Sequence, residues 1–207
     1  MTLSSTSFAD GQPLHPKFAL GVTPGYDAAA VFNVSPNLAW ADVPPATRSF
    51  VVTCIDPDAP ESKETDASGQ IPEDRARTDF VHWVLYDVPA DRRELGEGED
   101  SVGQTARGKD ASVRPYGTRG QNGYTAYFEG DTDLEGAYHG YDGPYPPFND
   151  ARVHRYVFTV YALDADTLGL APGATWEAVK AALKGHVLEQ AEVHGTYTLH
   201  PDLLGQP

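Results

Sequence analysis

The 207-residue sequence predicts a mainly β protein. Seventeen prolines and twenty glycines divide the chain into many short segments, which favours strands and loops over a helical bundle. Runs rich in Val, Phe, Tyr and Thr recur along the chain, whereas a helical pattern occurs only near the C-terminus. The length is enough for a substantial core, and we find neither an internal repeat nor a linker between globular halves, so residues 1–207 are expected to form a single domain.

Four segments are expected to be strands: Ser49–Ile55, Phe80–Val88, Tyr156–Leu163 and the shorter Thr196–Leu199. The first and third are almost continuously apolar, which is typical of central strands covered on both faces. Between the strands, the charged segment Glu61–Thr78 is expected to be a surface loop. The long polar stretch Ala90–Gly140 contains one weaker strand candidate, Tyr124–Phe128.

The C-terminal part contains the helical pattern. Thr175 can cap a helix over Trp176–Leu183, whose large apolar residues share one face. Gly185 ends this helix. A short second helix is expected over Val187–Glu192 before a last strand.

The composition excludes several classes of partner. Thirty acidic and fifteen basic residues give a formal net charge of −15, and this field repels nucleic acid and anionic membranes. No window holds the roughly eighteen apolar residues of a membrane helix, and the first residues lack the pattern of a signal peptide. The single cysteine, Cys54, allows no internal disulfide and lies in an apolar run, so we expect an inert core residue and a cytoplasmic protein.

The clearest lead to function is Asp56-Pro57-Asp58-Ala59-Pro60, where two carboxylates locked by prolines directly follow an apolar strand. His82 and His154 open two further apolar strands. Ionisable groups at the ends of three apolar strands indicate a pocket at the rim of a sheet. Each piece also has a plainer interpretation, because Asp and Pro form turns and a histidine at a strand start can be a half-buried structural residue.

Two further features fit such a pocket. On a strand, His154 and Tyr156 point to one face and Arg155 to the other, so an imidazole lies beside a phenol and the guanidinium can pair with a local carboxylate. The segment Gly143-Pro144-Tyr145-Pro146-Pro147 is stiff and has few amide hydrogens. It suits the fixed wall of a small cavity, although a polyproline-like surface turn is the alternative.

These pieces occur together in one known family. The chain resembles the phosphatidylethanolamine-binding proteins, also called Raf kinase inhibitor proteins, and specifically their prokaryotic branch. The matching motifs lie in the family's order between Phe18 and Tyr197: Ser35-Pro36-Asn37-Leu38-Ala39-Trp40, Val43-Pro44, Ser49-Phe50, Asp56-Pro57-Asp58-Ala59-Pro60, His82-Trp83, Gly140-Tyr141-Asp142-Gly143-Pro144-Tyr145-Pro146-Pro147, His154-Arg155-Tyr156 and Lys184-Gly185-His186.

The resemblance implies a large central β-sheet with a smaller second sheet, a few peripheral helices and a small anion pocket at one edge. In the family this pocket takes phosphate-like and carboxylate-like groups, including the phosphoethanolamine head of a lipid. Carried over by motif, the ligand-binding residues are Asp56, Pro60, His82, Tyr145, Pro146, His154 and Tyr156. Asp58 and Gly143 belong to the same motifs and are expected to support the pocket.

The sequence departs from the family pattern in two places. Many relatives have glycine shortly after the double proline, where this chain has Phe148-Asn149-Asp150. Asn tolerates the left-handed conformation, so the turn can form, but Phe148 could narrow the entrance. The stretch Val113–His139 is longer than in a typical prokaryotic relative and rich in aromatic residues. It could extend a sheet or serve as a contact surface.

The residues also suggest how an anion would be held. We expect Asp56 to orient both imidazoles and to raise their affinity for protons, so that charged rings and a tyrosine hydroxyl bind the anion. No serine or cysteine is recognisably paired with His82 or His154, so we expect no catalytic residue, and the family's cavity needs no metal or cofactor.

The expected function is therefore non-enzymatic binding of a small phosphorylated or carboxylate ligand. The resemblance implies a regulatory or inhibitory role toward a kinase or protease, and prokaryotic relatives suggest a homodimer. The alternative is an enzyme, a metal-assisted hydrolase that uses His82, His154 and Asp56 as ligands.

Overall fold

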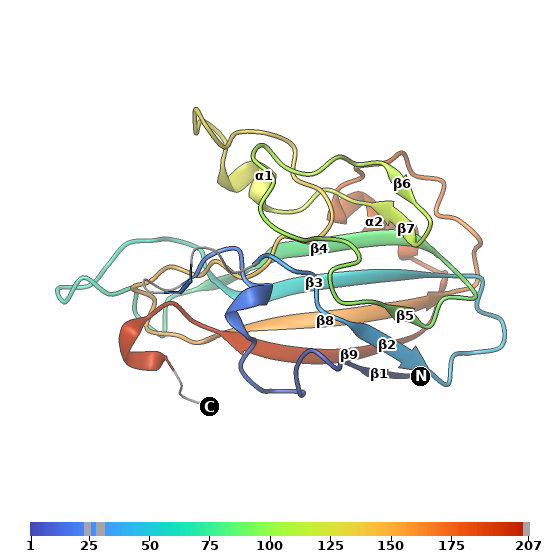
Figure 1. Cartoon of the computed structure of the whole chain (residues 1–207), viewed down its shortest axis with the longest axis horizontal. Coiled ribbons are helices and arrows are strands. Elements are labelled where there is room, and N and C mark those ends of the chain that lie inside the picture. The colour runs from blue at the N-terminus through green and yellow to red at the C-terminus, as the bar shows by residue number, and fades with distance from the viewer. Residues whose placement is uncertain (23–25, 28–31, 205–207) are drawn as a thin grey trace.

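The computed structural model describes residues 1–22, 26–27 and 32–204, which form two antiparallel sheets (Figure 1). The larger sheet has the strand order β6-β7-β4-β3-β8-β9 and the smaller one the order β1-β2-β5. The strands are β1 (Thr2–Ser4), β2 (Leu38–Ala41), β3 (Ser49–Pro60), β4 (Arg77–Pro89), β5 (Glu94–Leu95), β6 (Val113–Arg114), β7 (Gly117–Arg119), β8 (His154–Leu163) and β9 (Val187–Tyr197). The helices are α1 (Tyr124–Tyr127), α2 (Trp176–Leu183) and two 3-10 turns, Pro16–Phe18 and Pro201–Leu203. The predicted fold class is confirmed.

The two longest apolar runs form the middle of the large sheet, as predicted. In β3, Val52 pairs with Leu85 of β4 on one side and with Val160 of β8 on the other. Successive side chains point to opposite faces, so Val52 and Cys54 enter the core cluster shared with the small sheet, and Val51 enters the cluster under α2. Because apolar groups cover both faces, the run shows no polar alternation.

The predicted helix over Trp176–Leu183 is confirmed as α2. The Oγ1 atom of Thr175 accepts the amide hydrogen of Ala178 at 3.3 Å and caps the first turn. The apolar face of α2 is buried against Val84 and Tyr86 on the large sheet. This contact covers the face of the sheet that is opposite to β1, β2 and β5.

The predicted helix over Val187–Glu192 is wrong, because these residues form the first half of β9. β9 pairs with β8 along its whole length, from Val187 opposite Leu163 to Tyr197 opposite His154. Without β9, the edge of β8 would leave backbone N–H and C=O groups unpaired. This requirement outweighs the helix propensity of the Leu, Glu and Ala residues in the segment.

The predicted strand over Tyr124–Phe128 is also wrong, because its first four residues form α1. Asn122 Oδ1 accepts the amide of Tyr124 at 3.0 Å, and the amide of Phe128 donates to the Tyr124 carbonyl at 3.0 Å. This helical turn places the rings of Tyr124 and Phe128 in one buried cluster with Tyr138. Aromatic residues favour strands in general, but the local cluster decides the conformation here.

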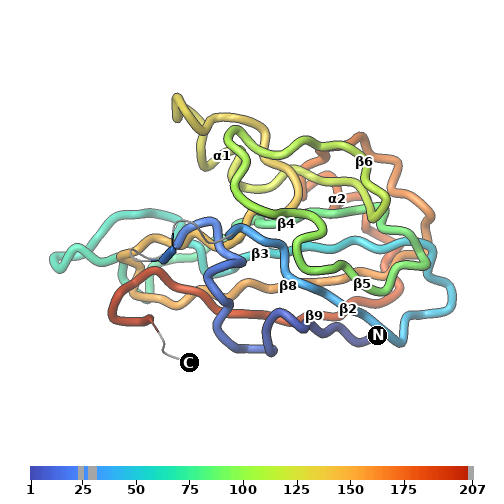
Figure 2. The backbone as a smooth tube through the Cα atoms, viewed as in Figure 1, coloured from blue at the N-terminus to red at the C-terminus, as the bar shows by residue number. Residues whose placement is uncertain are grey.

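The aromatic stretch Val113–His139 extends a sheet, which was one of the two options for it. β6 and β7 add to the large sheet beyond β4, while α1 lies near one end of that sheet (Figure 1). The predicted loop between β3 and β4 extends past the end of the sheet (Figure 2). Within the part of the chain that the structure describes, no helix has the length and apolar character needed to cross a membrane.

Candidate functional site

A cavity of about 130 Å³ lies where β3 ends and β8 begins. The structure brings all seven predicted ligand-binding residues to its lining: Asp56, Pro60, His82, Tyr145, Pro146, His154 and Tyr156. Pockets for drug-sized ligands measure roughly 300–1,000 Å³, so this one suits a small molecule or one end of a larger one. That these residues bind a ligand stays a prediction.

Seven further residues line the cavity: Ala59, Lys63, Thr78, Phe80, Tyr124, Tyr127 and Pro147. Thr78 and Phe80 share the face of β4 on which His82 lies, a two-residue period that the sequence could have revealed. Tyr124 and Tyr127 were missed because α1 was interpreted as a strand. Lys63 belongs to the loop after β3, and no local pattern in the sequence distinguishes it.

His154 is held between two carboxylates at the floor of the cavity. Its Nδ1 lies 2.7 Å from Oδ2 of Asp56, and its Nε2 lies 3.0 Å from Oδ2 of Asp150. All three side chains are buried. Since a carboxylate only accepts hydrogen bonds, this geometry suits the imidazolium form, in which both nitrogens donate. Burial lowers the pKa of His154, but the hydrogen bonds and negative charges of Asp150 and Asp56 outweigh it and raise the pKa to about 9.

This arrangement corrects one part of the expected mechanism. Asp56 orients His154, as predicted, but Asp150 occupies the nitrogen that was expected to bind the anion. His154 therefore supplies positive charge to the floor and has no N–H group free for a ligand. Asp150 was missed because it lies in a segment, Phe148-Asn149-Asp150, that departs from the family pattern.

Arginines hold the carboxylates around the floor. Arg77 binds Asp150 through both terminal nitrogens, at 2.6 and 3.0 Å. Arg155 donates its backbone amide and Nε to Asp58 at 3.0 and 2.8 Å, and Arg152 adds a contact at 3.2 Å. Burial raises the pKa of Asp58, but the hydrogen bonds and charges of these arginines lower it overall. Asp58 lies outside the lining and braces the segment around Pro57, the place predicted for it.

The charges of this cluster do not cancel. Its carboxylates are Asp56, Asp58 and Asp150, and its cations are Arg77, Arg152, Arg155 and the imidazolium of His154. This ion-pair cluster therefore carries one more positive than negative charge, although only Asp56 and His154 of it line the cavity. This local excess is notable in a chain whose formal net charge is −15.

His82 has one ring nitrogen engaged and one available. Its Nδ1 lies 2.8 Å from the carbonyl oxygen of Asp142, which can only accept, so Nδ1 carries the hydrogen. Among the described residues, the one geometrically defined hydrogen bond of this ring is that of Nδ1, and the backbone of Gly143 also acts on the ring to favour its charged form. Burial lowers the pKa of His82, although the charge of Asp56 acts in the opposite direction. Asp56 thus favours the protonated form of both rings, as expected, but at His82 burial outweighs this effect and the pKa is lowered overall.

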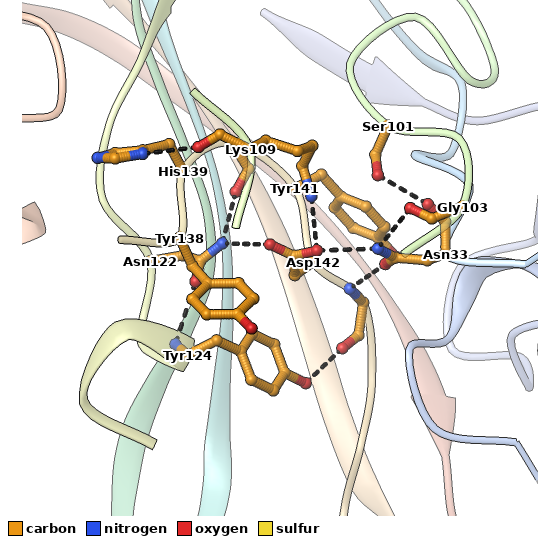
Figure 3. Close-up of polar contacts among 12 residues, drawn as sticks. Asn33, Ser101, Gly103, Lys109, Asn122, Tyr124, Tyr138, His139, Tyr141 and Asp142 are labelled. Carbon is orange, nitrogen blue, oxygen red and sulfur yellow. Dashed lines mark hydrogen bonds and ion pairs between the residues drawn. The ribbon is translucent and has the colours of Figure 1, made fainter. Parts of the chain in front are cut away.

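The carboxylate of Asp142 fixes the peptide that orients His82. It accepts hydrogen bonds from Asn33 Nδ2 at 2.8 Å, Asn122 Nδ2 at 2.9 Å and Lys109 Nζ at 2.5 Å, and Figure 3 shows these donors around it. All four side chains are buried. Three segments distant in sequence are thus tied to the backbone that holds His82.

Gly143 supports the wall of the cavity by its lack of a side chain. A Cβ atom there would lie 1.9 Å from the carbonyl oxygen of Phe18. Its amide donates to Asn33 Oδ1 at 2.9 Å, and its carbonyl accepts the hydroxyl of Tyr124 at 2.6 Å. Gly143 was expected to support the pocket, and that role stays a prediction.

The hydroxyl of Tyr156 differs from that of Tyr124. Tyr156 is fully buried, lines the cavity, and its Oη has no hydrogen-bond partner among the described residues. Burial, together with the charge of Asp56, raises the pKa of Tyr156 well above the ordinary value, so the hydroxyl remains protonated. An oxygen atom placed in the cavity could accept this hydrogen.

Phe148 does not narrow the entrance, contrary to the expectation. Its side chain is 71% exposed and it is not among the lining residues. The turn itself forms, with the amide of Asp150 donating to the carbonyl of Pro147 at 3.1 Å. The side chain of Phe148 therefore points away from the cavity.

The geometry gives the metal-assisted hydrolase no support. Within residues 1–22, 26–27 and 32–204, no group of three or more His, Cys, Asp or Glu side chains is placed to hold a metal ion. Both nitrogens of His154 face carboxylates, and His82 has only Nε2 available. Asp56 uses its second oxygen to accept the amide of Asp58 at 2.7 Å.

Comparison with known proteins adds independent information. The family model described as phosphatidylethanolamine-binding protein matches residues 4–198. The chain is 35% identical over 198 residues to the UPF0098 protein YbhB of Escherichia coli, covering 96% of this chain and 100% of that protein. It is 36% identical over 165 residues to a UPF0098 protein of Methanothermobacter thermautotrophicus, covering 80% and 83% of the two chains.

Two solved structures are similar over almost the whole chain. One is the phosphatidylethanolamine-binding protein homologue CT736 of Chlamydia trachomatis, with 27% identity, a TM-score of 0.63 and 95% of each chain covered. The other is YbcL of Escherichia coli, with a TM-score of 0.66, covering 95% of this chain and 97% of that one. At 24% identity, the likeness to YbcL concerns the fold alone.

Proposed function

The chain belongs to the phosphatidylethanolamine-binding protein family, and from this premise we propose that it binds a small anion in the cavity at the end of the large sheet. The anionic group is phosphate-like or carboxylate-like. The protein acts by binding and not by catalysis. Among the described residues, the cavity lining includes neither a serine nor a cysteine that an adjacent histidine could activate.

The single observation that carries the proposal is the unpartnered hydroxyl of Tyr156. A buried hydroxyl without a partner costs roughly 1–3 kcal/mol, and most buried polar groups have one. Here Tyr156 is one of the residues that line the cavity, and its ring lies beside that of His82, with ring centroids 5.1 Å apart. A ligand oxygen at this point would accept the hydrogen of this hydroxyl, a contact that a phenylalanine could not make.

The electrostatics support an anion over a neutral ligand. Among the charged residues that line the cavity, Lys63 and the imidazolium of His154 outnumber Asp56, and this excess attracts a negative group. His82 adds a second donor when its Nε2 takes up a proton. The anion is therefore held by Tyr156 and protonated His82, above the fixed charge of His154.

The test is a titration with methanesulfonate, whose charge is constant between pH 5 and 10, followed by isothermal calorimetry or NMR. Tyr156→Phe should weaken binding by about tenfold or more, because a hydrogen bond to a charged group is worth roughly 1.5–3 kcal/mol. Its melting temperature should stay equal or rise, since the variant removes a polar atom that lacks a partner.

Tyr138→Phe is the matched control. Tyr138 is buried outside the cavity lining, and its hydroxyl donates to the carbonyl of Leu134 at 2.8 Å. This variant should lose some stability and keep the wild-type affinity. Failure of the wild-type protein to bind methanesulfonate, phosphate or acetate at millimolar concentration would refute the proposal, as would equal affinities of wild type and Tyr156→Phe.

We further propose that the bound anion regulates a protein partner in the cytoplasm, and a kinase or a protease is the class suggested by the family. Inhibition of such an enzyme by the wild type but not by Tyr156→Phe would support this role. Equal inhibition by both proteins would show that inhibition does not depend on anion binding in the cavity. The expected homodimer also stays a prediction, which light scattering tests.

A further inference from the structure

Lys63 brings a positive charge to the cavity from outside the predicted motifs. It lies in the loop after β3, its side chain is exposed, and it is one of the lining residues. Its Nζ atom lies 4.4 Å from the centroid of the Tyr127 ring and donates to the Tyr127 hydroxyl at 3.3 Å. Since Tyr127 belongs to α1, this contact joins two elements that both border the cavity.

Both contacts of this ammonium group are with a neutral side chain. Among residues 1–22, 26–27 and 32–204, no carboxylate forms an ion pair with Lys63. By contrast, Lys17 pairs with Glu97 at 2.7 Å, and the buried Lys109 pairs with Asp142 at 2.5 Å. A contact between an exposed cation and an aromatic ring is weak. A ligand anion in the cavity would therefore compete well for the charge of Lys63.

The backbone around Lys63 is held, whereas its side chain can turn. The amide of Glu61 donates to the carbonyl of Ala76 at 3.0 Å and closes the base of the loop. The hydroxyl of Ser62 accepts the amide hydrogen of Glu64 at 3.2 Å, so the turn that contains Lys63 is fixed as well. Because the ammonium is carried on a flexible four-carbon stem, it can reach a ligand without rearrangement of the loop.

The charges that line the cavity match a doubly charged anion. Lys63, the imidazolium of His154 and, once protonated, His82 supply three positive charges, and Asp56 supplies one negative charge. The excess is therefore two positive charges. A ligand group with one negative charge would leave one of them uncompensated, whereas a group with two would neutralise both. Without Lys63, the excess would fall to one and would match a singly charged group.

We infer that Lys63 is a specificity-determining residue, which leaves the ring of Tyr127 to pair with the ligand and makes the cavity prefer a doubly charged anionic group. This inference rests on the proposed anion binding and deepens it. Phosphate monoesters meet the condition, because their second ionisation lies at about pH 6, and so does inorganic phosphate. Phosphate diesters, sulfate esters and carboxylates carry one charge. The rest of the ligand is not restricted, and an ammonium group further along it is compatible.

Methyl phosphate and methyl sulfate test the inference at pH 7.5, because they have nearly the same shape and differ by one charge. The wild type should bind methyl phosphate about fivefold more tightly, or better. Lys63→Gln should weaken methyl phosphate binding by about three- to fivefold, within the range of exposed charge pairs, and methyl sulfate binding by less than about twofold. Lys63→Arg, which keeps the charge, should retain the wild-type ratio.

Lys180→Gln is the matched control for the loss of a positive charge. Lys180 is exposed on α2 and lies outside the cavity lining, so the variant changes the net charge of the protein by the same amount. It should leave the ratio of the two affinities at the wild-type value. An equal fall of the ratio in Lys180→Gln and Lys63→Gln would show that the preference comes from the overall charge, and would overturn the inference.

The NMR signals of the Lys63 side chain report its movement. In the free protein, the methylene next to Nζ should be shifted upfield by the Tyr127 ring, because the ammonium lies over that ring. Saturation with methyl phosphate should remove this shift. A shift that persists at saturation would contradict the movement of Lys63 to the ligand.

Two further probes concern the source of the anionic group. Dimethyl phosphate, a diester with one charge, should bind like methyl sulfate, and binding as tight as that of methyl phosphate would contradict the inference. Inorganic phosphate should bind more tightly than methyl sulfate and should lose this advantage in Lys63→Gln. The affinities of inorganic phosphate and methyl phosphate then tell a free anion from an ester.

The outcomes separate the two proposals. If both methyl phosphate and methyl sulfate bind, but the wild type does not prefer methyl phosphate or Lys63→Gln keeps the wild-type ratio, the role of Lys63 is wrong and the anion role stands. If neither binds, the anion role fails and this inference fails with it. Thermal melts of each variant verify that the fold is intact.

Discussion

The Nε2 atom of His154 lies 3.0 Å from Oδ2 of Asp150, and this contact leaves the imidazole no free nitrogen because Asp56 occupies Nδ1. A histidine of the motif His154-Arg155-Tyr156 is thus a buried cation held by two carboxylates. The donors that we propose for the anion are the hydroxyl of Tyr156 and, after protonation, Nε2 of His82.

Protein stability should depend on the proton of His154. An imidazole titrates near pH 6.5 in the unfolded chain and at about 9 in the fold. Since the folded pKa is the higher one, the contribution is complete below pH 6.5 and is lost as pH rises through 9. At 1.36 kcal/mol per pKa unit, it amounts to roughly 3 kcal/mol.

Urea unfolding of the wild type and of His154→Gln between pH 6 and 10 measures this contribution. The difference between their free energies of unfolding should shrink by about 3 kcal/mol over this range. Comparing the two proteins cancels the other groups that titrate there. A difference that is constant with pH would show that His154 does not hold an extra proton in the fold.

Methanesulfonate affinity should rise as pH falls. Burial lowers the pKa of His82 in the free protein, and a bound anion beside Nε2 raises it, so binding takes up a proton. The charged groups that face His82 are Asp56 and Asp142. The rise should therefore continue below pH 6.5, the ordinary histidine value, and a second loss of affinity should occur near pH 9, where His154 deprotonates.

His82→Asn separates the two steps of this profile. The amide of asparagine can still donate to the carbonyl of Asp142, but it does not titrate. The variant should lose the acid-side dependence and keep the step near pH 9. An affinity that is flat between pH 5 and 8 in the wild type would contradict the role of His82.

The buried ion pair of Lys109 and Asp142 should be important for stability. Removing one partner leaves an uncompensated buried charge, which costs about 3–5 kcal/mol. Lys109→Met should therefore lower the free energy of unfolding by about this amount. Combining it with Asp142→Asn, which removes the orphaned charge, should recover more than half of the loss. A double variant no more stable than Lys109→Met would show that packing of the lysine stem, and not charge, is the cause.

Gly143→Ala should displace the wall of the cavity. The new methyl group would overlap the carbonyl oxygen of Phe18, and such overpacking costs about 1–3 kcal/mol. Binding of methanesulfonate should weaken as well, because the same peptide segment orients His82 and Tyr124. Gly96→Ala is the control, since its Cβ would meet only Glu99 Oε2, at 3.8 Å. Equal melting temperatures for the two variants would show that Gly143 does not support the site.

The sequence predicted the central strands well because their information is local. The apolar runs around Val52 and Val160 identify strands covered on both faces, and Thr175 identifies the start of α2. The segments whose secondary structure was predicted wrongly depend on partners that are distant in the sequence. Val187 lies in a strand only because β8 needs an edge partner, and Tyr124 is helical because its ring joins a cluster with Tyr138.

The candidate site, too, was predicted only in part. The order of the motifs along the chain predicted that His82, His154 and Tyr156 line one cavity. This prediction was possible because all three lie on strands, where side chains alternate between the two faces. The partners of these residues could not be predicted. Asp150 reaches His154 from a turn, and the carbonyl of Asp142 reaches His82 from across 60 residues of sequence. Hydrogen bonds of this kind decide which nitrogen is free, and therefore what each histidine can do.

The most direct test of the central claim is the ¹⁵N NMR spectrum of histidine-labelled protein, recorded at pH 6.5 while methanesulfonate is added. The account predicts that both nitrogens of His154 are protonated before and after binding. It predicts that His82 begins with its hydrogen on Nδ1 and gains protonation at Nε2 as the cavity fills. A neutral His154 in the free protein, or a His82 signal that is unchanged at saturating ligand, would contradict it.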